Sequence, residues 1–436
     1  MRTLIKNAWI LTMDSKRNEY RHGQLVMEDD RIVYVGDAIS HRNIDKVIDA
    51  ENCIVLPGMV NTHCHVPMIP FRSLGDDCPD RLRRFLFPLE NACMNRELTY
   101  LSARYGIGEM LLSGITAFAD MYYFMEDVAK ACEEIGIRAV LGETIINQPT
   151  CDAENAYKAL EIGEDFIRKW KGHALISPML APHGTNTVTE DIFQKTMEIV
   201  KKYDTLCMCH VSEMDYEMSY FRDKFQMTPV EWLKSIDCLN EHLLAVHCIH
   251  LTDSDIELMR KYNVKVSHCP VSNLKAGKGI APVRDMVNQH LAVGLGTDGA
   301  SSGNTLDLFI QMRMFAGAQK TKYHDRSLFP AKEIVALSTI EGAKALRMEK
   351  EIGSLEIGKK ADIILVSLDA PHMFPIHDPY SLLVYSANAS DVRDVFVNGK
   401  HLVKDRKLAV DFTQLKKDLQ YAMTDFCKKA EELSKA

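Results

Sequence analysis

The sequence lacks several features that would assign it to a special class of protein. It has no run of about 18 apolar residues, so we expect no segment to span a bilayer. It has no excess of basic residues, since 52 Lys and Arg against 60 Asp and Glu give a net charge of −8. A protein that mainly binds nucleic acid or an anionic membrane usually shows such an excess. Low-complexity segments and short-period repeats are missing too, and we expect an ordinary globular protein with a small-molecule partner.

An export signal is also missing. The first twenty residues contain a short apolar stretch that Lys6, Asn7 and Asp14 interrupt, without the continuous apolar region and small-residue cleavage site of a signal peptide. The 12 cysteines are scattered from Cys53 to Cys427, and we expect them to be reduced thiols. The expectation is a cytoplasmic protein. Its 436 residues suggest two or three domains, or one large barrel with an addition.

Strand-like apolar runs alternate with amphipathic helical stretches through the middle of the chain. Eight such runs predict an α/β fold in which a closed parallel (β/α)8 barrel of the TIM type forms. An open doubly wound sheet fits six of the eight runs nearly as well and stays an alternative. The runs are Val60–His65, Ile115–Met121, Arg138–Thr144, Leu175–His183, Leu206–Val211, Leu244–His250, Val264–Cys269 and Ala292–Asp298.

The two ends of the chain have a different sequence pattern from the middle. Residues 1–57 and 353–411 contain short alternating strands, and Asn398–Gly399 is a hairpin signal between two of them. We expect these ends to meet in one small β-sandwich domain beside a catalytic barrel formed by residues 58–352. Residues 412–436 carry apolar positions at helical spacing and predict a C-terminal helix, which covers the barrel or contributes to a dimer interface.

Histidines and one aspartate stand at the ends of the predicted barrel strands. His63 and His65 form an H-x-H pair, whose side chains share one face of a strand. His210, His247 and Asp298 stand at or near the ends of three further runs. Barrel strands deliver these ends to one rim, so the five side chains could converge there. Three histidines and one aspartate suit Zn²⁺ or Fe²⁺ better than Mg²⁺, and we expect one divalent ion, zinc by preference.

Two further residue types stand beside these histidines. Glu213 follows His210 in HVSE and is placed to exchange protons with a water that the metal activates, although a solvated surface glutamate is the alternative. Four cysteines each neighbour a histidine and should turn to the opposite face as small buried fillers: Cys64, Cys209, Cys248 and Cys269.

Five segments in this order resemble one family over nearly the whole chain. They read PGMVNTHCH, CHVSE, VHCIHL, SHCPVSN and LGTDGASSGNTLDLF, and they are similar to the motifs of the amidohydrolase superfamily. Within it the chain resembles the mononuclear deaminase branch that includes 5-methylthioadenosine/S-adenosylhomocysteine deaminase. Binuclear members carry a carboxylated lysine on the fourth strand. Here that strand reads ALISPMLAPHG, so the resemblance implies a single metal ion.

The resemblance also implies roles for individual residues. Glu213 is similar to the family's proton shuttle, and His247 to its residue beside the activated water and the reacting centre. Glu90 in FPLEN and His183 in APHGTN match positions that bind substrate, and Glu213 and Asp298 are expected to contact the substrate as well. Asp298 is also expected to be catalytic, because it holds a proton of the attacking water. The metal ligands implied are His63, His65, His210 and Asp298.

The activity implied is hydrolytic deamination of an adenosine-type nucleoside, with ammonia and the inosine-type compound as products. Family members that act on S-adenosylhomocysteine use an arginine just after the third strand, where this chain has Glu143. That departure favours 5-methylthioadenosine or another neutral adenosine derivative. Deaminases or chlorohydrolases of guanine, pterin or triazine rings share the scaffold and remain the alternative. A third hypothesis is a metal-binding protein without turnover. The presence of Glu213 argues against it, because binding alone does not require a proton shuttle.

Three further expectations concern a histidine, an aspartate and the oligomeric state. His268 in SHCPVSN is interpreted as a packed histidine rather than a ligand. Asp120, at the end of the second run, is either a helix cap or salt-bridge partner or a member of the site. Members of the family often self-associate, so the resemblance implies a homo-oligomer.

Overall fold

The central element of the computed structural model, which describes residues 1–435, is a sheet of eight parallel strands rolled into a barrel. Each strand pairs with its sequence neighbour. The strands are β6 (Met59–Cys64), β7 (Ile115–Tyr122), β8 (Arg138–Ile145), β9 (Ile176–Pro182), β10 (Cys207–Val211), β11 (Leu243–His247), β12 (Lys265–His268) and β13 (Val293–Leu295). The predicted α/β barrel is thereby confirmed.

The barrel is closed by the backbone just beyond β13. The amides of Thr297 and Asp298 donate to the carbonyl of His63 on β6, at 3.0 and 3.1 Å. Asn61 on β6 supports this closure, because its Oδ1 accepts from the Thr297 amide at 3.0 Å and its Nδ2 donates to the Thr297 hydroxyl at 2.8 Å. These bonds connect the first and last strands, which an open doubly wound sheet would leave apart.

Several strands end earlier than predicted. His65, His183 and Asp298 were expected inside strands, but His65 and His183 directly follow β6 and β9, and Asp298 lies three residues beyond the end of β13. β11 ends at His247, three residues before the predicted end at His250. The functional side chains therefore lie at the points where the chain leaves the sheet, where backbone angles can vary from residue to residue.

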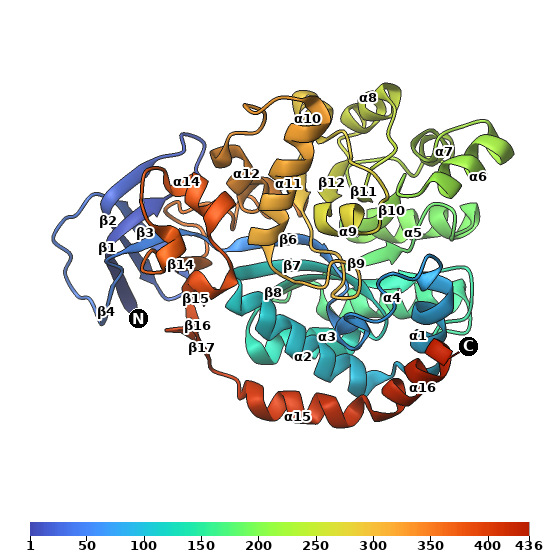
Figure 1. The fold of residues 1–436 in the computed structure, drawn as a ribbon, viewed down its shortest axis with the longest axis horizontal. Helices are drawn as coiled ribbons and strands as arrows, with labels where there is room; N and C mark the ends of the chain where they lie inside the picture. Colours follow the sequence, from blue (N-terminus) through green and yellow to red (C-terminus); the bar gives the residue numbers. More distant parts are fainter. Residues whose placement is uncertain (436) are drawn as a thin grey trace.

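Helices cover the outside of the barrel (Figure 1). In α4, the side chain of Asn155 caps the first turn by accepting from the Lys158 amide at 3.0 Å, and the apolar residues of one face are buried. The longer helices are α2 (Arg96–Leu112), α3 (Met125–Ile135), α4 (Ala156–Trp170), α5 (Glu190–Tyr203), α6 (Asp215–Phe225), α8 (Asp253–Lys261) and α11 (Leu308–Tyr323). The shorter ones are α1 (Phe87–Cys93), α7 (Pro229–Ser235), α9 (Pro270–Lys275), α10 (Val283–Asn288), α12 (Ala331–Leu337), α13 (Ile340–Ala345) and α14 (Pro379–Ser381).

Both ends of the chain contribute to a second sheet, at the left of Figure 1. β5 (Cys53–Pro57) pairs antiparallel with β14 (Ile363–Ser367), and this pairing joins the N-terminal to the C-terminal strands. The other strands are β1 (Arg2–Leu11), β2 (Glu19–Glu28), β3 (Arg31–Gly36), β4 (Lys46–Asp49), β15 (Val392–Val397), β16 (Lys400–Lys404) and β17 (Lys407–Leu408). The two ends thus meet beside the barrel as expected, while the proposed domain boundaries at 57/58 and 352/353 stay predictions.

The segment predicted as one C-terminal helix consists of two. α15 (Phe412–Ala422) and α16 (Thr424–Lys435) are separated at Met423. Figure 1 shows α15 running along the outside of α2 and α16 reaching α1, and both helix pairs are in contact. Of the two roles considered for this segment, the structure shows the covering of barrel helices.

Apolar residues form separate clusters inside and outside the barrel. Val60, Met208 and Val246 belong to the inner cluster, whereas Cys64, Cys209 and Cys248 belong to the larger cluster between strands and helices. The prediction that these cysteines are buried fillers is therefore consistent with their surroundings. Cys269 is buried as well but faces the inner cluster, so its neighbour His268 points outward.

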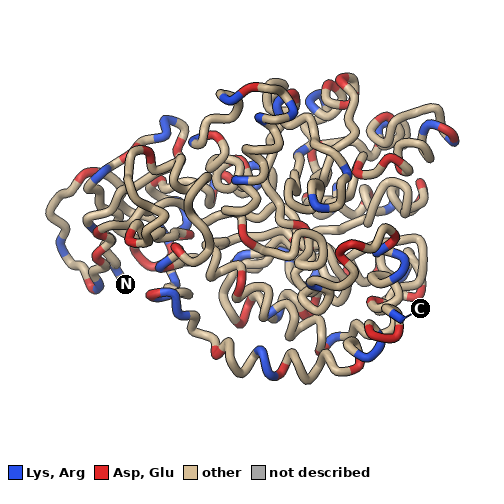
Figure 2. The backbone as a smooth tube through the Cα atoms, in the orientation of Figure 1, with Lys and Arg blue, Asp and Glu red and all other residues tan. Residues whose placement is uncertain are grey.

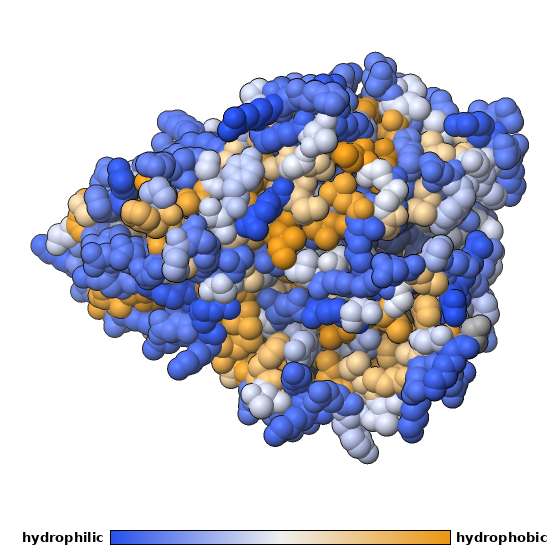
Figure 3. All heavy atoms as spheres, viewed as in Figure 1, coloured by the Kyte–Doolittle hydropathy of each residue, from blue (hydrophilic) through white to orange (hydrophobic). Residues whose placement is uncertain are grey.

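The surface is mixed in charge. Figure 2 shows acidic and basic residues interspersed along the whole chain, and Figure 3 shows a largely hydrophilic face with scattered apolar areas. Among residues 1–435, none of the helices combines the length and the apolar character that a membrane crossing needs.

A buried ion pair joins the two sheets and yields a stability prediction. Arg138, the first residue of β8, donates to both carboxylate oxygens of Asp362, which precedes β14, at 2.9 and 3.1 Å. Both residues are buried. Removing one partner of a buried pair leaves the other charge uncompensated, so Arg138→Met should lower the free energy of unfolding by about 3 kcal/mol.

Urea denaturation followed by circular dichroism measures this change. The double variant Arg138→Met with Asp362→Leu removes both charges and should recover part of the loss. A loss below about 1 kcal/mol in the single variant would show that the pair does not hold the sheets together.

Candidate functional site

Four histidines and one aspartate converge at the carboxyl end of the barrel. The ring centres of His63 lie 4.7, 5.1 and 5.9 Å from those of His65, His210 and His247. Two atom sets could each hold a metal ion, because their donor atoms lie within 4.8 Å of one another: His63, His210 and His247, and His63, His65 and Asp298. The structure thus brings together residues that are up to 235 positions apart in the sequence, as the strand ends predicted.

The imidazole rings are fixed through their Nδ1 atoms. His65 Nδ1 lies 2.6 Å from the carbonyl oxygen of Met121, and His210 Nδ1 lies 2.5 Å from that of His183. His63 Nδ1 lies 3.0 Å from the sulfur of Met208. Since these partners accept hydrogen bonds, Nδ1 carries the proton and Nε2 presents a lone pair to the centre. Accordingly, His210 Nε2 lies 3.4 Å from His63 Nε2.

Three of the four proposed ligands have the protonation state of a metal ligand, and His65 is the exception. Burial lowers the pKa of His65, but the hydrogen bond and charge of Asp298 outweigh it and raise this pKa to about 9, so the ring must lose a proton when an ion binds. Burial holds the pKa values of His63 and His210 well below the ordinary value, so both rings are neutral. At Asp298 burial favours the protonated acid, but the hydrogen bond and charge of His65 outweigh it and hold the pKa of this carboxyl well below its usual range. Neutral imidazoles and an ionised carboxylate are the forms that bind a divalent ion.

Asp298 has a strained backbone, and hydrogen bonds hold its carboxylate in place. Its backbone is left-handed, with φ of 57°, and His247 shares this feature with φ of 70°. Oδ2 accepts from the Ser272 hydroxyl at 2.6 Å, and Oδ1 accepts from the Gly299 amide at 2.7 Å while lying 3.3 Å from His65 Nε2. Such backbone angles raise the energy by about 1–3 kcal/mol per residue and persist only where the surroundings impose them.

Glu213 lies beside the imidazole cluster rather than in solvent. Its Oε1 is 3.4 Å from His247 Nε2 and accepts a hydrogen bond from Lys278. Burial favours the neutral acid, but His247 and Lys278 outweigh it and hold the pKa of Glu213 well below its usual range. The position of the proposed shuttle next to the centre agrees with the prediction, whereas its role stays a prediction.

Two further predictions concern the neighbours of the cluster. Asp120 Oδ1 accepts from the Val66 amide at 2.6 Å, at the start of the short helix Val66–Phe71, and so holds the chain immediately after His65. The helix-cap reading of Asp120 is the one that the geometry shows. His268 packs on Phe315 of α11, with ring centres 5.8 Å apart, and does not join either candidate ligand set.

Two of the predicted substrate residues, Glu90 and His183, lie close to the cluster. Glu90 on α1 is buried beside Tyr122, and burial raises its pKa to about 7. His183 has its ring centre 5.1 Å from that of His210, and burial lowers its pKa to about 4, so the ring is neutral. Its Nδ1 is 3.0 Å from the Thr187 hydroxyl. Phe87 of α1 lies 6.3 Å from His183, ring centre to ring centre.

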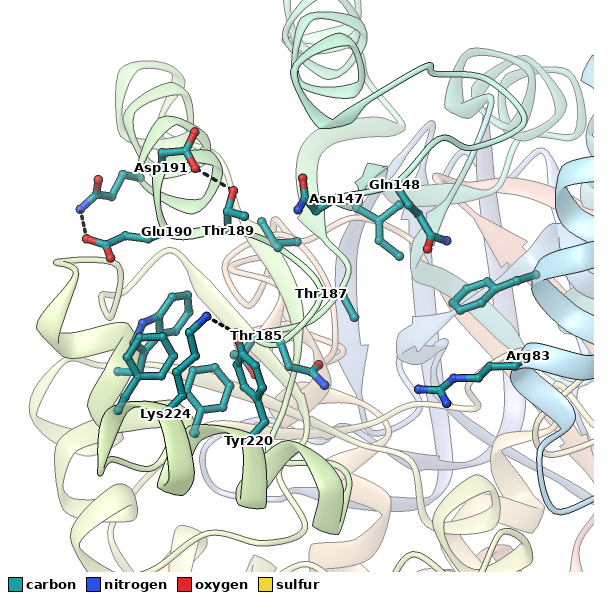
Figure 4. A pocket seen from close by; sticks show the side chains of 18 residues that line it. Arg83, Asn147, Gln148, Thr185, Thr187, Thr189, Glu190, Asp191, Tyr220 and Lys224 are labelled. Atoms are coloured by element: carbon teal, nitrogen blue, oxygen red, sulfur yellow. Dashed lines mark hydrogen bonds between the residues drawn. The ribbon is translucent and has the colours of Figure 1, made fainter.

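A cavity of about 1030 Å³ is lined by Phe87 and by Thr187, the residue whose hydroxyl contacts His183. Figure 4 shows this cavity from close by. Arg83 reaches toward it from the side opposite Tyr220 and Lys224. In the part of the chain that the structure describes, the guanidinium of Arg83 makes neither a hydrogen bond nor an ion pair. Other lining residues are Asn147, Gln148, Thr185, Asn186, Thr187, Glu190 and Asp191.

The cation at this cavity was missed by the sequence analysis, which considered only Glu143. Glu143 does not line the cavity. It is buried, and its Oε2 accepts from the Met125 amide at 3.2 Å, at the start of α3. Arg83 lies in the helical turn Leu82–Leu86, just before α1 and the Glu90 motif. Its closeness to Glu90 in the sequence could have indicated that it lies near the substrate. Lys278, next to Glu213, was missed as well.

Known proteins match the chain over almost its full length. The model described as "Amidohydrolase family" matches residues 54–402. The 5-methylthioadenosine/S-adenosylhomocysteine deaminase 1 of Syntrophus aciditrophicus is 36% identical over 411 residues, 93% of each chain. The 5'-deoxyadenosine deaminase of Methanosarcina barkeri is 38% identical over 434 residues, 99% of this chain and 98% of that one. A zinc-bound adenosine deaminase from Xanthomonas campestris superposes with a TM-score of 0.95 at 28% identity, covering 100% and 99% of the two chains.

Proposed function

Since the chain belongs to the amidohydrolase family and is a hydrolase of carbon–nitrogen bonds, we propose that it is a metal-dependent deaminase of 6-aminopurine nucleosides. Its substrate class comprises 5-methylthioadenosine, S-adenosylhomocysteine and related adenosine derivatives, in which the bond broken is that of a cyclic amidine. The observation that carries this proposal is the placement of Glu213 beside a cluster of imidazoles and an ionised aspartate. Relatives with deaminase names at 36–38% identity support the substrate class.

The residues of the cluster fit one divalent ion, which we propose to be zinc, with iron as the alternative. His63, His65, His210 and Asp298 would hold it. The Asp298 carboxylate lies 3.8 and 3.3 Å from Nε2 of His63 and His65, and His63 Nε2 lies 3.4 Å from His210 Nε2, so His63 connects the two candidate sets. Imidazole nitrogens with one carboxylate oxygen are a donor set typical of zinc and iron. When bound, such an ion supplies Lewis acidity and lowers the pKa of a water towards neutrality.

Glu213 and His247 then move and guide the protons. The attacking water gives a proton to the Glu213 carboxylate, which passes it to the ring nitrogen next to the carbon that bears the amino group. The second proton of the water reaches the amino group through the same carboxylate, so that ammonia leaves and a ring carbonyl remains. His247 donates from Nδ1 to the Asn273 side-chain oxygen at 2.9 Å, so its Nε2 accepts a hydrogen bond from the attacking water.

The remaining contacts would select the nucleoside. The Glu90 carboxyl would bind the ribose hydroxyls, and the His183 ring would make another contact with the substrate. The cavity would receive the substituent at the 5' end, because it is lined by Phe87 and Thr187, which both lie next to His183. Its lining combines polar side chains with aromatic and aliphatic ones, which suits a substituent that has both hydrogen-bonding and apolar groups.

A kinetic comparison tests the proposal directly. Purified protein is given 5-methylthioadenosine, S-adenosylhomocysteine, adenosine and guanine, and ammonia release and the ultraviolet spectrum are followed. We expect turnover of the nucleosides and none of guanine. Turnover of guanine, a pterin or a triazine in place of the nucleosides would replace the proposed substrate class, and no turnover of any amino-heterocycle would contradict the proposed activity.

Arg83 provides a prediction about the 5' substituent. The carboxylate of S-adenosylhomocysteine is a partner for the free guanidinium, whereas 5-methylthioadenosine has no charge there. Hydrogen bonds between charged groups contribute about 1.5–3 kcal/mol when well formed. Because Arg83 is exposed, Arg83→Gln should lower kcat/KM for S-adenosylhomocysteine by only about tenfold and leave that for 5-methylthioadenosine within about twofold.

Arg84 is the matched control for this measurement. Its guanidinium lies over the ring of Phe85, 5.4 Å from the ring centre, and it does not line the cavity. Arg84→Gln should therefore leave the kcat/KM values for both nucleosides unchanged. Equal losses for both nucleosides in Arg83→Gln would show that this arginine does not recognise the substituent.

A further inference from the structure

One short segment contacts three of the proposed catalytic side chains. It consists of α9 and the turn that follows, residues 270–279. Ser272 donates to Asp298, and Asn273 accepts from His247 Nδ1. Lys278, at the end of the segment, donates to Glu213. The first two residues belong to the SHCPVSN motif, whereas Lys278 lies outside every motif that the sequence analysis used.

Lys278 is held in place by its own backbone. Its amide donates to the Asn273 carbonyl at 2.9 Å, so its position depends on the residue that fixes His247. Gly277 and Gly279 on either side have φ of +63° and +119°, angles that L side chains rarely adopt. A Cβ on Gly279 would lie 3.0 Å from the Ile249 side chain, so the turn packs closely against the loop after β11.

The lysine side chain is directed inward and largely desolvated. Its side chain is 17% exposed, and that of Glu213 is 19% exposed. Lysine is strongly hydrated and loses much rotational freedom when fixed, so such a placement persists only with a compensating partner. Here the partner is the Glu213 carboxylate, and no other acceptor for the ammonium is present within residues 1–435.

Both contacts of Glu213 go to the same oxygen. Lys278 and His247 Nε2 both approach Oε1. Across the described chain, no protein hydrogen bond reaches Oε2. One oxygen of the carboxylate is thus anchored, and the other is left to exchange protons with the reacting groups.

We infer that Lys278 is a positioning residue for the proton shuttle: its ammonium anchors Oε1 of Glu213 so that Oε2 faces the reacting centre. This inference rests on the proposed function, because it assigns Lys278 a part in the deamination step. This carboxylate takes up two protons in turn and delivers them to two different atoms. Its orientation must therefore be fixed. Without the ammonium, no hydrogen-bond donor among residues 1–435 holds the carboxylate, because the neighbouring His247 Nε2 presents a lone pair, and the side chain can rotate away.

The test compares Lys278→Met with Lys278→Arg and a matched control. The control is Lys275→Met: Lys275 lies in the same segment and pairs with Asp76 at 2.8 Å, away from the cluster. We expect Lys278→Met to lower kcat about 30-fold with KM within about twofold, since orientation of an acid–base group acts on the chemical step. Lys278→Arg should recover at least about tenfold of this loss, and Lys275→Met should behave as the unchanged protein.

A crystal structure of Lys278→Met gives a second measurement that needs no turnover. We expect the Glu213 carboxylate to have left its position beside His247 Nε2. The inference is overturned if kcat of Lys278→Met stays within about twofold of the unchanged protein, if Lys278→Arg is no faster than Lys278→Met, or if Glu213 keeps its place without the ammonium.

The two hypotheses fail in different ways. Turnover of nucleosides by the unchanged protein tests the proposed function, and the variants do not enter that comparison. The position of Glu213 in the Lys278→Met structure tests the anchoring even if another amino-heterocycle proves to be the substrate.

Discussion

Replacement of Glu213 by glutamine is expected to lower kcat by about 10³-fold, with the metal content unchanged. The amide occupies nearly the same volume and can still accept from Lys278, but it cannot take up a proton from water and release it again. General acid–base groups contribute about 10²–10⁴-fold each, and Glu213 is asked to serve both the ring nitrogen and the leaving amine. We therefore expect the loss of kcat to lie well above the lower limit of that range.

The experiment combines steady-state kinetics on 5-methylthioadenosine with elemental analysis of the same preparation. Asp215→Asn is the matched control, because this acid is two residues further on, its side chain is 95% exposed, and it lies 3.5 Å from His250 Nε2 rather than at the cluster. It should keep kcat within about twofold. A Glu213→Gln variant that retains more than about a tenth of the turnover would assign the proton transfer to another group.

The barrel and the residues at its rim could be predicted from the sequence because each depends on a local pattern. Strand-like runs that alternate with amphipathic helices predict parallel strands, and parallel strands place their carboxyl ends together. His63, His210, His247 and Asp298 therefore converge although they are distant in sequence. The H-x-H spacing indicated the pair His63 and His65 even though His65 lies just beyond β6.

The residues that were missed depend on tertiary packing that a local pattern does not contain. Arg83 enters the rim because the turn Leu82–Leu86 is placed against the cavity. Lys278 faces Glu213 because two glycines turn the chain after α9. Glu143 was taken to stand just after the third strand, whereas it lies within β8 and its carboxylate accepts from the Met125 amide at the start of α3. The sequence position alone does not indicate which way such a side chain points. The sequence around Met423 contains no proline or glycine that would have predicted the break between α15 and α16.

Removal of the metal should have the largest effect of all, because one buried centre serves both water activation and substrate polarisation. We expect protein dialysed against a strong chelator until elemental analysis finds less than about 0.05 ion per chain to lose turnover in proportion to the metal removed. One equivalent of Zn²⁺ or Fe²⁺ should restore it. Undiminished turnover by metal-free protein would contradict the proposed chemistry.

The variant Asp298→Ala extends this prediction to a single ligand. The carboxylate is the sole anionic member of the proposed ligand set, and its loss leaves the three imidazoles of that set and removes the partner of His65 at 3.3 Å. We expect the variant to bind metal at least about 100-fold more weakly and to lose kcat by about 10³-fold or more even with excess metal.

His268→Gln is the control for Asp298→Ala, because His268 is buried near the same rim yet packs on Phe315 and belongs to neither set. It should retain one ion per chain and most of its turnover. If Asp298→Ala instead kept both its metal and its rate while His268→Gln lost them, the centre would lie on the outer side of β12. The geometry argues against that outcome, because the Nε2 atoms of His63 and His65 both face the Asp298 carboxylate, at 3.8 and 3.3 Å.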